Sequence, residues 1–148
     1  MKNIFNISEQ NEILQRLEKL SPQSKNLWGK MNSSQMLAHC VRPMQMATGD
    51  LIVKPSPMRF IGRFFKNYLL SEKPLAKNGP TAPEFIVSDA KEFGREKENF
   101  LKAFEKLAKG GKSVIKTEKH PFFGTMKSDE WARLTYKHLD HHFNQFGV

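Results

Sequence analysis

The chain has very little cysteine, and it lacks any long apolar run. Its 148 residues include a single cysteine, Cys40, which excludes an internal disulfide framework and is typical of a reducing compartment. No stretch approaches the roughly 20 consecutive apolar residues of a membrane-spanning helix, and the N-terminal residues lack the apolar core of a secretory signal. We therefore expect a soluble, cytoplasmic protein.

Several familiar functional motifs are also missing. The sequence has no glycine-rich phosphate loop, no G-x-S-x-G nucleophile motif and no H-E-x-x-H zinc motif. It also lacks zinc-finger spacings and the aromatic and glycine signature of an RNA-recognition sheet, although its net charge is +9. Excess positive charge more often serves solubility, so nucleic acid is a disfavoured partner.

The apolar residues that are present suffice for one domain. Hydrophobic residues make up 39% of the chain and include 12 phenylalanines. A chain of this length buries about two thirds of its unfolded surface, so we expect a single domain spanning residues 1–148.

Four long segments have the apolar periodicity of helices, and no strand pattern competes with them. The first begins near Ser8 and ends at Ser21-Pro22. The second is capped by Asn32 with Gln35 three residues later, and it closes at Gly49-Asp50. The third runs from Ser88 or Asp89, with Glu92 completing its cap, to Gly110-Gly111, and Ser128 caps the fourth. The pattern predicts an all-α protein built as a four-helix bundle.

A short extra helix and a long crossover loop are expected between the second and third long helices. Residues 58–70 place five bulky side chains on one face, away from Arg59, Arg63 and Lys66; these are Phe60, Ile61, Phe64, Phe65 and Tyr68. Such a helix either lies on an anionic membrane or packs over the core as a lid. We favour the packed lid, which makes a membrane surface a disfavoured partner. Residues 71–83 follow as a loop that could border a site.

The last helix carries a histidine pair with metal-ligand spacing. His138 and His142 lie about 40° apart on one helix face, and Gln145 falls about 20° from His138. Trp131 shares this face, which therefore points inward. Two neutral imidazoles on an inward face are either buried hydrogen-bonded groups or metal ligands.

A third ligand is available from the second helix. His39 lies in an apolar stretch, and side chains of different helices meet at the axis of a bundle. Three histidines would leave open positions for water or substrate on a divalent ion. His141 lies about 60° from His138 and could replace His142 as ligand. Pro43, four residues after His39, predicts a local kink.

Three other residues have open roles. Gln145 either bonds across the bundle or orients a ligand imidazole. His120 is a loop ligand, a substrate contact or the first residue of a turn. Cys40 is rotated about 100° from His39, which favours a small buried thiol over a nucleophile. No general base or other catalytic residue is identified.

These motifs resemble those of the DinB-like superfamily of metal-dependent enzymes, in its branch of uncharacterised proteins. The likeness rests on Met36-Leu-Ala-His39, on the HPFFG run that begins at His120, and on the H-x-x-H-H-x-x-Q-F-G run that begins at His138. It implies a four-helix bundle, often dimeric, with a divalent metal held by His39, His138 and His142.

The resemblance also implies a range of chemistry. Members of the superfamily include thiol-dependent transferases, isomerases and hydrolases that use glutathione, mycothiol or bacillithiol. For this chain it predicts a metal-dependent enzyme acting on a small molecule, with Zn, Ni, Mn or Fe and a low-molecular-weight thiol as cofactors. The alternative is a non-catalytic stress-related or binding bundle whose histidines are structural.

Overall fold

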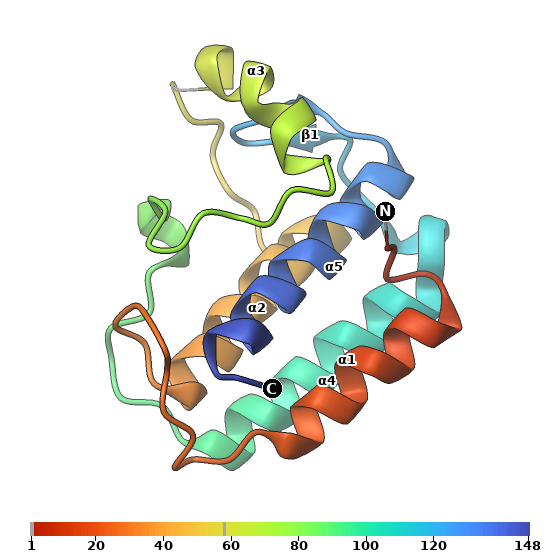
Figure 1. Ribbon diagram of the computed structural model, residues 1–148. Helices are drawn as coiled ribbons and strands as arrows, with labels where there is room; N and C mark the ends of the chain where they lie inside the picture. Colours follow the sequence, from red (N-terminus) through yellow and green to blue (C-terminus); the bar gives the residue numbers. More distant parts are fainter. Residues whose placement is uncertain (1, 58) are drawn as a thin grey trace.

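The computed structural model describes residues 2–57 and 59–148, apart from the side chains of Arg59 and Arg63. The predicted start of the short helix at Met58, and the predicted outward turn of those two arginines, lie outside this description. The fold is mostly helical (Figure 1). The elements are α1 (Ile7–Lys19), α2 (Ser33–Thr48), α3 (Arg59–Leu69), η1 (Pro83–Phe85), α4 (Phe93–Gly110), η2 (Gly111–Val114), β1 (Lys119–His120), β2 (Gly124–Thr125) and α5 (Ser128–Gln145).

The four long helices enclose the core. Helix α2 packs against both α4 and α5, and α1 packs against α5. Helix α1 also runs beside α4, where Lys97 forms an ion pair with Glu18 at 3.2 Å (Figure 1). The largest fully buried side chains come from the later helices and include Trp131, Phe100, Phe104 and Phe143. No helix in the described residues is long and apolar enough to cross a membrane.

Helix α2 begins and ends as the sequence predicts. The Asn32 side chain accepts a hydrogen bond from the Gln35 N–H, and the Gln35 side chain accepts one from the Asn32 N–H. Gly49 ends the helix in the left-handed conformation, at φ 77°, which a glycine adopts without strain. Helix α2 continues past Pro43 from Ser33 to Thr48, so His39 lies well inside a continuous helix.

Two helix starts differ from the predictions. Helix α4 begins at Phe93, because the Glu92 carboxylate accepts hydrogen bonds from the Gly94 and Arg95 N–H groups and is itself the cap. Ser128 is the first residue of α5 and not its cap.

The chain also contains a small hairpin that the sequence pattern does not predict. Strands β1 and β2 pair antiparallel, with His120 opposite Gly124. Each strand has only two residues, too few for an alternating pattern to be recognised.

Helix α3 forms where predicted but is oriented differently from a packed lid. Its aromatic side chains, among them Phe64 and Phe65, are exposed to solvent. The side that faces the protein carries Gly62, where a Cβ would collide with the Phe122 carbonyl oxygen. The prediction of a lid with its apolar face on the core is therefore wrong, because the helix approaches the protein through its glycine.

We expect Gly62→Ala to push α3 away from the turn at Phe122. The added methyl group has no room against a backbone oxygen, and such overpacking costs about 1–3 kcal/mol. Hydrogen exchange should become faster across 59–69 in this variant. Gly79→Ala is a suitable control, because its Cβ would make only an ordinary contact of 3.4 Å. Unchanged exchange in Gly62→Ala would show that α3 does not need this close approach.

Candidate metal centre

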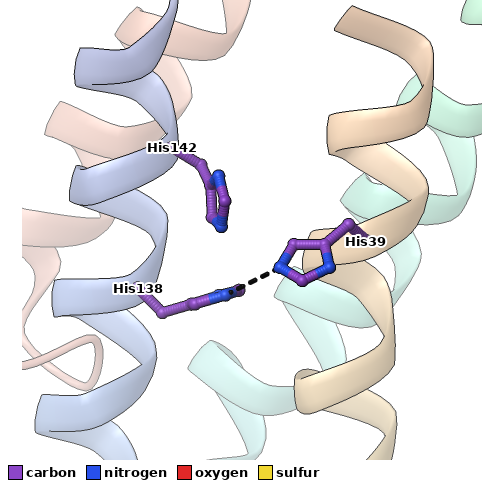
Figure 2. A group of neighbouring side chains, drawn as sticks. All are labelled: His39, His138 and His142. Atoms are coloured by element: carbon purple, nitrogen blue, oxygen red, sulfur yellow. Dashed lines mark hydrogen bonds between the residues drawn. The ribbon is translucent and has the colours of Figure 1, made fainter. Parts of the chain in front are cut away.

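Three histidines from two helices point into the space between those helices (Figure 2). His39 comes from the middle of α2, and His138 and His142 come from successive turns of α5. Each offers a ring nitrogen, and these nitrogens all lie within 4.8 Å of one another. His39 and His142 are buried and His138 is half-buried. The structure thus brings together the three histidines for which the sequence predicts metal ligation.

The His39 ring is held by a backbone carbonyl. Its Nδ1 lies 2.8 Å from the carbonyl oxygen of Phe85, the last residue of η1. A carbonyl oxygen only accepts hydrogen bonds, so this nitrogen carries the proton. The Nε2 atom is then unprotonated, and it lies 3.1 Å from Nε2 of His138 (Figure 2).

The His142 ring is held in the same manner by a side-chain amide. The Gln145 Nε2 group donates to the Trp28 carbonyl at 2.7 Å, which identifies the other end of the amide as the oxygen. That oxygen lies 2.8 Å from His142 Nδ1, so Nδ1 carries the proton and Nε2 is free to act as a ligand.

Burial keeps the cluster uncharged. It lowers the pKa of His39 and lowers that of His138 well below the usual value, and the neighbouring histidines lower the His138 pKa further. Burial, together with the proximity of His39, lowers the pKa of His142 to about 3. The three rings are therefore neutral near pH 7, which is the form that binds metal ions.

The donor set fits a divalent cation. Because His39 Nε2 is unprotonated, the His138 Nε2–H group is the donor of the 3.1 Å hydrogen bond between them, and a cation that replaced this proton would be shared by the two nitrogens. Hydrogen bonds from Nδ1 to a carbonyl and to an amide are the usual supports of metal-bound histidines. Neutral imidazole suits Zn, Ni, Cu and Fe.

The other histidines lie outside the cluster. The His141 ring packs edge-on against Trp28, with ring centres 5.7 Å apart. His120 Nδ1 accepts hydrogen bonds from the Phe122 and Phe123 N–H groups, and its ring stacks on Phe123. His120 is therefore the first residue of a turn, which was one of its three predicted roles.

Two further residues fill structural roles in the described structure. The Cys40 thiol is buried next to the Met36 sulfur, and burial raises its pKa, so it is not an active nucleophile. Asp140 forms an ion pair with Arg16 at 2.6 Å, on the side of α5 away from the cluster.

Sequence reasoning did not identify two contributors to the site. Phe85 contributes its backbone carbonyl, and any residue has one, so no sequence signal could have found it. Trp28 also contributes a carbonyl, and its ring contacts His141. The Trp28 indole N–H is the one buried side-chain polar group without a hydrogen-bond partner among the described residues. A tryptophan in a polar, glycine-containing stretch was the available signal.

Comparison with known proteins identifies the family of the chain. Residues 2–147 match the family described as protein of unknown function (DUF1569). The chain therefore belongs to this family. No curated protein and no solved structure matches significantly.

We expect His120 to make the protein sensitive to acid. Burial lowers its pKa from 6.5 to about 3. Below pH 6.5 the unfolded chain binds a proton at this residue that the folded protein does not, so stability falls as the pH decreases toward 3. His120 alone should account for a loss of about 1.4 kcal/mol in the free energy of unfolding for each pH unit in this window, or about 2 kcal/mol at pH 5.

His120→Asn should remove this loss, because an amide oxygen can accept the Phe122 N–H bond but does not titrate. Urea unfolding of both proteins at pH 7 and pH 5 measures the difference. If the two proteins lose the same free energy between these pH values, His120 is not the source of acid sensitivity.

Proposed function

We propose that this DUF1569 protein is a metal-dependent enzyme of the DinB-like superfamily that acts on a small molecule. Residues 1–148 would then form one DinB-like four-helix bundle. The observation that carries the proposal is the convergence of three neutral imidazoles, two of them with Nδ1 held by a hydrogen-bond acceptor. The four-residue spacing of His138 and His142, which is part of the motif that suggested the superfamily, places both rings on the side of α5 that faces His39.

The residues have distinct roles in this proposal. His39, His138 and His142 hold a divalent ion such as Zn, Ni, Mn or Fe. The Phe85 carbonyl and the Gln145 amide keep two of these rings in the ligating tautomer. When bound, the ion polarises a substrate or lowers the pKa of a thiol or water molecule. Substrate approaches on the His138 side, since His138 is the half-buried ligand.

A lysine near the cluster supports an anionic substrate or cofactor. The Lys77 ammonium lies 4.3 Å above the centre of the Trp28 ring, and this ring contacts His141, the neighbour of His142. The loop that carries Lys77 thus places a positive charge beside the site. We propose that this charge attracts the carboxylate of a low-molecular-weight thiol, the cofactor class that the superfamily uses.

We expect the protein to bind a stoichiometric divalent ion that is lost when a ligand is removed. His39→Ala and His142→Ala should each reduce the bound metal to background, because two remaining imidazoles hold an ion weakly. Elemental analysis after dialysis against zinc, nickel or manganese measures the occupancy, and circular dichroism verifies retained helicity. His141→Ala is the matched control, because it removes an imidazole from the same helix outside the cluster.

The results separate the candidate functions. Unchanged metal occupancy in His39→Ala and His142→Ala would contradict shared ligation. Stoichiometric metal without consumption of glutathione or bacillithiol in the presence of electrophilic acceptors would favour a binding bundle over a thiol transferase.

We expect Gln145→Leu to weaken metal binding without abolishing it. The change leaves all three ligand rings in place but removes the acceptor of the His142 Nδ1–H bond. Loss of such a supporting bond typically reduces metal affinity about 10–100-fold. Competition with a chromophoric chelator measures the dissociation constant. An affinity equal to that of the unmodified chain would mean that Gln145 only links α5 to the Trp28 segment.

A further inference from the structure

Helix α3 presents an apolar surface to solvent. Five bulky side chains lie on one side of this 11-residue helix, and each is between 42% and 73% exposed: Phe60, Ile61, Phe64, Phe65 and Tyr68. We call them the α3 face. Contiguous exposed apolar side chains of this kind mark interaction surfaces more often than scattered single ones.

The outward orientation of the α3 face is fixed by contacts on the opposite side. Gly62 sits against the Phe122 carbonyl. The Lys66 ammonium forms an ion pair with Glu130 at 2.8 Å and donates to the Thr125 carbonyl at 2.6 Å. Turning the aromatic side chains inward would break these contacts.

The C-terminal end of α3 is held as well. Lys137, which is buried on α5, donates to the carbonyl oxygens of Tyr68, Leu69 and Ser71 at 2.9–3.2 Å. Tyr68 and Leu69 lie in the last turn of α3, where a cation also complements the helix dipole. Helix α3 is therefore attached to the protein by polar contacts on one side and exposes its apolar side chains on the other.

The charge around α3 indicates what kind of partner surface the α3 face could meet. Residues 51–74 contain five basic residues and one acidic residue, and the whole chain carries a net charge of +9. A second copy of the chain would bring these positive charges together. An anionic lipid surface would attract them, and aromatic side chains favour the boundary between headgroups and acyl chains.

We propose that the α3 face docks on the surface of an anionic phospholipid bilayer. The aromatic side chains enter the interface, and exposed lysines that flank the helix, such as Lys54 and Lys73, lie among the headgroups. The protein attaches to one leaflet without spanning it, in keeping with a short helix flanked by Pro57 and Pro74.

Vesicle flotation tests the proposal with the full chain. Vesicles of phosphatidylcholine alone are compared with vesicles that contain 30% phosphatidylglycerol, at low and at high salt. We expect at least tenfold stronger partitioning onto the anionic vesicles, and weaker partitioning as salt screens the charges. Phe65→Ser should reduce partitioning about tenfold, since it removes one large side chain from the interface.

Ile7→Ser is the matched control, because it also removes an exposed apolar side chain, 73% exposed, but from α1. This control should partition like the unmodified chain. Both variants should retain their circular dichroism spectrum and melting temperature, since neither side chain is buried.

Three results would overturn the proposal. Partitioning that is absent, or equal on neutral and anionic vesicles, excludes an anionic membrane surface. Self-association in light scattering that Phe65→Ser abolishes assigns the α3 face to a second copy of the chain. Binding to vesicles that Phe65→Ser does not weaken, and that duplex DNA competes away, reduces the interaction to positive charge alone.

Discussion

The candidate site depends on two hydrogen bonds that leave imidazole lone pairs directed at one another. A buried neutral histidine ordinarily satisfies both ring nitrogens with protein partners. Here the Phe85 carbonyl and the Gln145 amide satisfy only the Nδ1 atoms of His39 and His142. The Nε2 atoms face the centre of the cluster, where His138 alone cannot serve both of them. A cation shared by all three rings, as proposed above, would engage all three nitrogens at once.

Much of this site follows from periodicity, and the remainder depends on tertiary contacts. The spacing of His138, His142 and Gln145 places them on one face of any helix, and the Asn32–Gln35 capping box positions α2 correctly. Neither pattern contains the partner of His39, because Phe85 contributes a backbone atom from η1, 46 residues along the chain. The choice between His141 and His142 was likewise open in the sequence. In the structure the ring nitrogens of His142 lie with those of His39 and His138, while the His141 ring lies against Trp28.

Helix α3 shows a different limit of sequence reasoning. Amphipathicity predicts that a helix has an apolar face, but it does not say which face meets the protein. In globular proteins that face is usually buried, and this expectation led to the lid hypothesis. The orientation is decided instead by Gly62, which allows a close approach to Phe122, and by the lysine contacts at Lys66 and Lys137. Within α3 itself, the glycine and the lysine among the aromatic residues were the sequence signals that could have predicted this orientation.

Helix α5 contributes both to the attachment of α3 and to the histidine cluster. Along α5, Glu130 pairs with Lys66, Lys137 binds the end of α3, and the next residue is the candidate ligand His138. Adjacent helical residues point about 100° apart, so Lys137 and His138 face different neighbours while sharing one backbone. Any displacement of α3 that pulls on Lys137 is therefore transmitted to the backbone of the half-buried ligand. Because the Phe85 carbonyl and the Gln145 amide hold the Nδ1 atoms of His39 and His142, His138 is the ring of the three that such a displacement would move most easily.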